Sequence, residues 1–258
     1  MVDFPSKDKY NAEDYRALVE VLRGEGGCPW DRAQTHATLR RFLLEESAEL
    51  CEAIDENDAE HMKEELGDVW LQILLHASIE QEKGTFDLDD VADASCKKLI
   101  FRHPFVFGGQ TVSAEEAYQQ WEAVKRVEKQ QKTASQAMNE VCRTLPSLWR
   151  AGKIQKKGAD FLWEDADAAE EAVRGYAEQL RTAEGEAWQK TLGELLFAAN
   201  AAARLRGADA EESLHAACEE HIRRFAALEE SALAQGMSFE DMSGAEKRTF
   251  AREHGQNE

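Results

Sequence analysis

The sequence has little proline and little basic charge. It holds 4 prolines in 258 residues, and its 51 acidic residues outnumber the 31 basic ones to give a net charge of −20. A surface of this kind cannot displace counterions from a phosphate backbone, which argues against DNA or RNA polymers as partners. It is equally unsuited to docking on an anionic membrane. We therefore expect partners that are neither nucleic acid polymers nor membranes.

Long apolar runs and cysteine motifs are also missing. No run reaches the roughly 18 apolar residues of a membrane-spanning helix, and the first ten residues contain no apolar signal-peptide core. The 5 cysteines are scattered and never spaced as CxxC, which argues against a disulfide framework and against a thiolate zinc site. These features together favour the cytoplasm.

Helix-forming residues dominate what is present. Hydrophobic residues make up 43% of the chain, enough to bury a core, and Ala, Glu and Leu favour an all-α fold. The segment FVF at 105–107 is a candidate for a short extended piece. Apolar periodicity and capping signals predict helices at about 12–24, 36–56, 59–83, 87–102, 113–131, 146–157, 165–183, 186–206 and 209–235, with a short one near the end.

A polar stretch at about 130–139 divides the chain, since it is rich in Lys, Gln, Ser and Thr and has no apolar periodicity. It predicts an N-terminal domain at 1–130, a linker at 131–145 and a C-terminal domain at 146–258. The segment LGDVWLQILLHAS (66–78) matches LGELLFAANAAAR (192–204) in character and register. One helix-pair unit is therefore expected twice, with its apolar face covered by a copy or by a partner chain.

Two predicted helices each carry two acidic residues spaced three apart. Glu46 and Glu49 stand on the first helix, and Glu65 and Asp68 on the second. Residues three apart share one face of a helix, so an antiparallel hairpin would bring the two pairs face to face. Four carboxylates repel one another unless a cation lies between them, which predicts a Mg²⁺ site, with Mn²⁺ as the alternative ion. Such acids also occur on solvated helix faces, and that interpretation stays open.

Four ordered motifs extend the pattern: GGCPWDRAQTHATLRRFLLEESAEL, EELGDVWLQILLHA, KLIFRHPFVF and WEAVKRVEK. With them the sequence resembles the MazG family of nucleoside triphosphate pyrophosphohydrolases over about residues 18–225. The resemblance implies two tandem MazG-like helical-bundle repeats, completed by homodimerisation. It also implies metal-dependent hydrolysis of a nucleoside triphosphate to a monophosphate and pyrophosphate, in the clearance of unwanted nucleotides.

The resemblance further implies roles for particular residues. Glu46, Glu49, Glu65 and Asp68 match the family's metal ligands. Water would attack the α-phosphorus, and either Glu45 or Glu49 would accept its proton.

The substrate-binding positions lie further along the chain. Lys98, Arg102 and Lys125 match positions that bind phosphate. Trp121 fits a platform on which a base could stack. These four residues complete the predicted site of the first repeat.

The second repeat departs from the family pattern. The first acidic motif becomes Gly175–Glu178 or Tyr176–Gln179, depending on the alignment, and the second becomes Thr191–Glu194. At most two of four acids survive, so we expect this repeat to be catalytically inactive. Two alternatives for the whole chain remain: a narrower pyrophosphohydrolase acting on dUTP, dCTP or phosphoribosyl-ATP, and a non-enzymatic helical dimerisation module.

Overall fold

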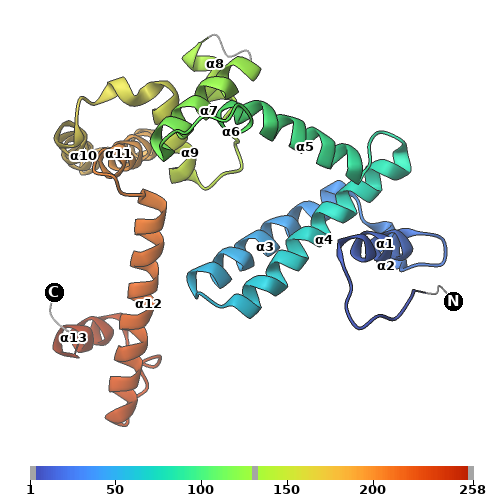
Figure 1. The fold of residues 1–258 in the computed structure, drawn as a ribbon. Helices are drawn as coiled ribbons and strands as arrows, with labels where there is room; N and C mark the ends of the chain where they lie inside the picture. Colours follow the sequence, from blue (N-terminus) through green and yellow to red (C-terminus); the bar gives the residue numbers. More distant parts are fainter. Residues whose placement is uncertain (1–3, 130–132, 255–258) are drawn as a thin grey trace. The chain divides into compact units, whose positions relative to one another are not determined.

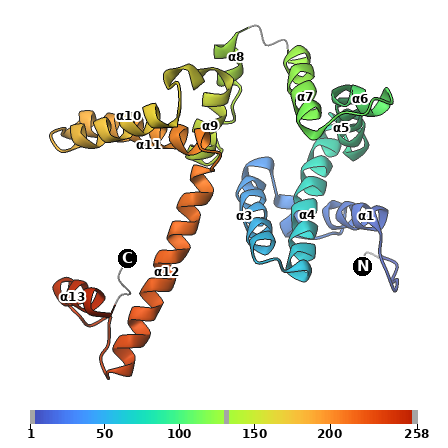
Figure 2. The same ribbon diagram turned by 60° about the vertical axis from the view of Figure 1, so that its left-hand side comes forward.

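The computed structural model describes residues 4–129 and 133–254, and their regular elements are all helical (Figures 1 and 2). This confirms the predicted all-α class. The chain divides into two compact units, Met1–Glu128 and Lys129–Glu258. Among the described helices, none combines the length and the apolar content needed to cross a membrane.

Unit 1 is built around the helical hairpin of α3 and α4. Its helices are α1 (Ala12–Arg23), α2 (Pro29–Ala33), α3 (His36–Asp55), α4 (Ala59–Lys83), α5 (Leu88–Arg102), α6 (Pro104–Phe107) and α7 (Ala114–Glu128). Side-chain caps begin both helices of the hairpin: Thr35 accepts from the backbone N–H of Thr38, and Asp58 accepts from those of Glu60 and His61. The predicted helix boundaries therefore hold here to within one residue.

The hairpin turns at Asn57, which adopts a left-handed conformation with φ of 54°. Helices α3 and α4 lie side by side (Figures 1 and 2). Away from the turn they pack on α1 through a small apolar core. This core consists of Val19, Leu39, Leu74, Leu75 and Ile79.

Two local expectations were wrong or incomplete. FVF at 105–107 is helical, as part of α6, rather than extended. Pro104 presets the first turn of this helix, the Phe105 side chain is buried, and the N–H of Gly108 bonds the carbonyl of Pro104. The short helix α2, which has Pro29 at its start, was not anticipated.

Unit 2 contains a second hairpin, α10 with α11. Its helices are α8 (Ala134–Asn139), α9 (Ser147–Ile154), a π turn η1 (Gln155–Ala159), a 3₁₀ turn η2 (Asp160–Leu162), α10 (Ala166–Leu180), α11 (Gly185–Leu205), α12 (Ala210–Ala234) and α13 (Gly244–His254). Small residues let α10 and α11 approach closely, with Ala169 and Ala201 fully buried. Helix α8 lies inside the stretch predicted as a linker, part of which falls outside the described residues.

Candidate active site

The turn at Asn57 determines which acidic residues face each other. Glu49 and Glu65 lie eight residues before and after it, and Glu46 and Asp68 lie eleven residues before and after it. Residues equally distant from the turn lie opposite one another in an antiparallel hairpin. Carboxylate oxygens of Glu46, Glu49 and Glu65 accordingly lie within 4.8 Å of one another. The structure thus brings three of the four predicted metal ligands into one cluster.

Asp68 lies beside this cluster, one helical turn after Glu65. Burial and neighbouring negative charges, that of Asp68 foremost, raise the pKa of the Glu46 carboxyl. Burial and then the charge of Asp68 likewise raise the pKa of Tyr15. Glu45 is exposed, and its charge makes the smallest contribution to the raised pKa of Glu46. The predicted acidic residues therefore act on one another electrostatically, as a shared site requires.

Glu65 is the most buried member of the cluster, with 7% of its surface exposed. Its Oε1 lies 3.4 Å from Nε2 of His61. Its Oε2 is buried and has no hydrogen-bond partner among the described residues. An uncompensated buried carboxylate is costly. A divalent cation that prefers oxygen ligands suits this arrangement.

The predicted substrate-binding residues form a separate group on α5 and α7. Trp121 is half-buried between two cations: Nζ of Lys125 lies 4.4 Å from the ring centroid, and Cζ of Arg102 lies 5.6 Å from it. The Nε of Arg102 also donates to Oε2 of Glu128 at 2.6 Å. Lys98 is exposed one turn earlier on α5. The contacts that the structure gives for Arg102, Trp121 and Lys125 all lie within α5 and α7. Among the described residues, none of these contacts involves the acidic cluster of the hairpin.

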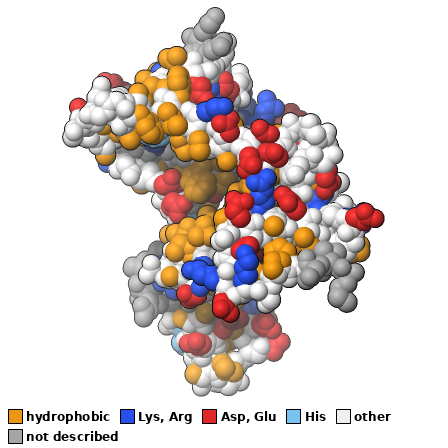
Figure 3. Space-filling model, turned by 45° about the vertical axis from the view of Figure 1, so that its right-hand side comes forward, with side chains coloured by type: hydrophobic (Ala, Val, Ile, Leu, Met, Phe, Trp, Pro, Cys, Tyr) orange, Lys and Arg blue, Asp and Glu red, His pale blue; other side chains and the backbone are white. Residues whose placement is uncertain are grey.

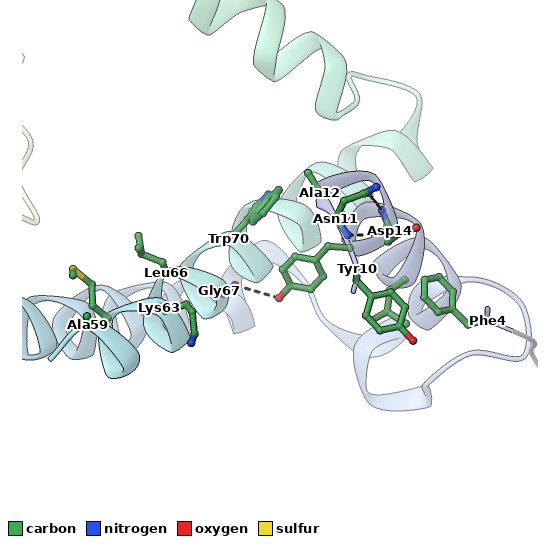
Figure 4. A pocket seen from close by; sticks show the side chains of 13 residues that line it. Phe4, Tyr10, Asn11, Ala12, Asp14, Ala59, Lys63, Leu66, Gly67 and Trp70 are labelled. Carbon is green, nitrogen blue, oxygen red and sulfur yellow. Dashed lines mark hydrogen bonds between the residues drawn. The ribbon is translucent and has the colours of Figure 1, made fainter. Parts of the chain in front are cut away.

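Sequence reasoning missed a cavity of about 790 Å³ between α1 and α4 (Figure 4). The hydroxyl of Tyr15 donates to the carbonyl of Gly67 at 3.1 Å, directly between Glu65 and Asp68 in the chain. The rings of Tyr15 and Trp70 meet edge-on at 5.5 Å. A largely apolar cavity next to an acidic cluster can hold a flat aromatic group. Tyr10, Tyr15 and Trp70 were the signal available in the sequence.

Comparison with known proteins gives consistent matches. A family model described as the MazG nucleotide pyrophosphohydrolase domain matches residues 34–107. The nucleoside triphosphate pyrophosphohydrolase/pyrophosphatase MazG of Thermotoga maritima is 37% identical over 233 residues, which are 89% of this chain and 90% of that protein. The nucleoside triphosphate pyrophosphohydrolase of Escherichia coli K12 is 36% identical over 249 residues, which are 90% of this chain and 91% of that protein.

A solved structure of a mazG-related protein from Thermotoga maritima shares 31% identity, with a TM-score of 0.40. It covers 45% of this chain and 99% of its own. The full-length relatives carry the assignment: the chain is an all-helical member of a hydrolase family. It belongs to the MazG family of nucleotide pyrophosphohydrolases, which confirms the resemblance found in the sequence.

Proposed function

We propose that this chain hydrolyses nucleoside triphosphates to a nucleoside monophosphate and pyrophosphate at the acidic hairpin of unit 1. Full-length relatives that carry this activity in their names support the reaction. The observation that carries the location is the convergence of Glu46, Glu49 and Glu65 within 4.8 Å, with one oxygen of Glu65 buried and unpartnered.

The acidic residues fit a divalent cation. Glu46, Glu49, Glu65 and Asp68 would hold Mg²⁺, or Mn²⁺ in its place. The raised pKa of Glu46 supports this, because burial and then the negative charges of its neighbours disfavour its ionised form, and a bound cation would offset both effects. When bound, such an ion neutralises charge on phosphate oxygens and lowers the pKa of a coordinated water.

The reaction requires a proton acceptor near the attacking water. The water oxygen forms a bond to the α-phosphorus while the bond from that phosphorus to the bridging oxygen breaks, and pyrophosphate leaves with that oxygen. We assign the water's proton to Glu45 rather than Glu49. Glu49 belongs to the converging group and a ligand carboxylate is a poor base, whereas exposed Glu45 stands next to the group without being part of it.

Phosphate binding falls to Lys98, Arg102 and Lys125, and base stacking to Trp121. Because this group is separate from the carboxylates, the proposal includes a homodimer in which one copy's α5 and α7 complete the other's site. Part of α4 leaves Leu66, Trp70 and Ile73 38–53% exposed, while Leu74 is buried in the core of unit 1. On the face drawn in Figure 3, hydrophobic side chains gather in patches of the kind that a second copy could cover.

Unit 2 is proposed to be a degenerate repeat without catalytic activity. Its two surviving acids, Glu178 and Glu194, are both exposed. Glu178 is paired with Arg181 at 3.2 Å. Neither residue has the burial that distinguishes Glu65, so we do not expect this hairpin to hold a catalytic ion.

Pyrophosphate release from a panel of NTPs and dNTPs with Mg²⁺ tests the proposal. We expect activity in the wild type, loss by at least about a hundredfold in Glu65→Ala, and no loss in Glu64→Ala. Glu64 is the exposed neighbour of Glu65 on α4 and provides a matched control. Activity that survives in Glu65→Ala would place the site elsewhere.

The same panel distinguishes the alternatives. Turnover of a single dNTP would favour a narrower pyrophosphohydrolase. Thermal stabilisation by Mg²⁺ that disappears in Asp68→Asn would support the ion site even where no substrate is found. An inactive protein whose thermal stability does not change with Mg²⁺ would favour the dimerisation module.

A further inference from the structure

The segment 141–159 has a charge opposite to that of the whole chain. It contains five basic residues and no acidic one, although the chain carries 51 acids. The five are Arg143, Arg150, Lys153, Lys156 and Lys157. Helix α9 and the π turn η1 carry four of them, and both elements belong to unit 2.

Two of these lysines line a cavity of about 490 Å³ inside unit 2. The cavity lies where α9, the end of α11 and the start of α12 meet. Lys153 and Lys156 come from α9 and η1, and Arg204 comes from the last turn of α11. Asp209 is the single acid among the lining residues, and the nearby Glu211 accepts through Oε2 from the backbone N–H of the lining residue Leu148 at 3.2 Å, so the three cations outnumber the acids.

These cations lack the partners that other basic residues of the chain have. Arg206, two residues after Arg204, pairs with Glu170 at 2.5 Å and with Asp167 at 2.8 Å. Within the described residues, no ion pair or hydrogen bond is found for the charged ends of Lys153, Lys156 or Arg204. The Nε of Arg204 is moreover buried without a partner. A buried guanidinium donor needs an acceptor, and an anion in the cavity would supply one.

Buried amide side chains form the wall behind these cations. The side chain of Gln155 is fully buried and donates through Nε2 to the carbonyl of Phe197 at 2.8 Å. Asn200, 5% exposed, lines the cavity, and its side-chain amide lies 3.0 Å from Oε1 of Gln155. These bonds join η1 to α11, so Lys156 and Arg204 stand on elements that are held together.

The acid in the cavity is already engaged. Oδ1 of Asp209 accepts from Nε1 of Trp149 at 3.1 Å and from the backbone N–H groups of Glu211 and Glu212. It thus caps the 25-residue helix α12, whose first residue, Ala210, also lines the cavity. Glu211 and Glu212 stand in the first turn of α12 as well, so acidic side chains already offset the positive end of this helix, and the three cations carry the positive charge of the cavity.

We propose that this cavity binds a phosphate-bearing anion, either free pyrophosphate or the phosphate group of a nucleotide. The three unpaired cations provide the charge, and Arg204 provides a directed donor. The site does not depend on the acidic hairpin of unit 1 or on the reaction proposed there. It gives unit 2 a binding role although its hairpin has lost most of the acidic pattern.

Calorimetric titration of the full chain in EDTA tests the proposal, with pyrophosphate and AMP as separate probes. EDTA keeps divalent cations away from the carboxylates of unit 1, which then repel both anions. We expect saturable binding of at least one probe. The double variant Lys153→Ala/Lys156→Ala, in which both residues are exposed, should weaken that binding at least tenfold. Lys190→Ala, at an exposed position on α11 outside the cavity, should bind as the wild type does.

The two probes distinguish the source of the phosphate. Binding of pyrophosphate alone supports the inorganic anion, and binding of AMP supports a nucleotide. Arg204→Gln provides a second variant, which should also weaken binding of the probe. Circular dichroism checks that each variant is folded. The proposal is overturned if neither probe binds at millimolar concentration. It is also overturned if the folded double variant binds the probe as tightly as the wild type does.

Discussion

The Nδ1 atoms of His36 and His76 lie 2.6 Å apart, with the two ring planes within 7° of parallel. Only one proton fits between two facing nitrogens, so at least one of the two Nδ1 atoms must be unprotonated. On its other side, Nε2 of His36 lies 2.6 Å from Oε1 of Glu80. This chain of contacts ties the first residue of α3 to the last turns of α4. Sequence reasoning did not single it out.

Acidification should weaken this connection. Burial, and then the charge of His36, lower the pKa of His76. Below the unfolded-state pKa of about 6.5, the unfolded chain therefore binds the proton more readily, and stability falls as the pH falls. Hydrogen bonds from Lys83, Thr85 and His36 lower the pKa of Glu80 to about 2. The ionised Glu80 therefore also stabilises the folded state at neutral pH. That stability is lost only as the pH falls from about 4.3 to 2.

Melting temperatures measured from pH 7.5 to 5.5 check this. We expect a decline in the wild type that is shallower in His76→Gln. The exposed His215 offers a control, and His215→Gln should keep the wild-type slope. An unchanged slope in His76→Gln would mean that other groups cause the decline.

Removing the charge of Glu65 should stabilise the metal-free protein. Its buried Oε2 has no partner among the described residues, and it faces Glu46 and Glu49. A glutamine there is neutral and can donate to its neighbours, so Glu65→Gln should gain about 1 kcal/mol, or roughly 2–4 °C in melting temperature. Differential scanning calorimetry in EDTA measures this, with Glu64→Gln expected near zero. A lower melting temperature for Glu65→Gln would contradict the repulsion that we infer.

The hydroxyl of Tyr15 should contribute measurably to the packing of α1 on α4. It donates to the carbonyl of Gly67 in a part-buried setting. Tyr15→Phe removes this bond and little else, so the free energy of unfolding should fall by about 1 kcal/mol. Urea unfolding measures the change. Tyr118, 56% exposed on α7, is the comparison, and Tyr118→Phe should cost much less. Equal effects in the two variants would assign no specific role to the bond.

Lys98 should contribute to triphosphate binding if the proposed function is correct. Lys98→Gln removes one charge-assisted contact to phosphate, which should raise KM by roughly tenfold. Its neighbour Lys97 is paired with Asp93 at 2.5 Å on the same helix. Lys97→Gln should therefore leave KM unchanged in the same steady-state assay. Equal shifts in the two variants would indicate a general electrostatic effect of α5.

Local features of the fold were predictable from the chain alone. The boundaries of α3 and α4 follow from apolar periodicity and from the capping residue Asp58. The facing of Glu46 and Glu49 toward α4 follows from their spacing of three and from the turn at Asn57. FVF at 105–107 was misjudged because Pro104 can start a helix as readily as end one, and burial of Phe105 favoured the helix.

The ends of α3 and α4 and the pairing of acids across their hairpin are properties of neighbouring residues, so the chain alone was sufficient to determine them. The burial of Glu65, the contact between His36 and His76, and the unpaired cations around Arg204 depend on residues that are distant in sequence. Periodicity shows which face of a helix is apolar, but not which distant side chain covers it. Those features were settled by packing in three dimensions, because burial and hydrogen-bond partners exist only once the helices are in contact.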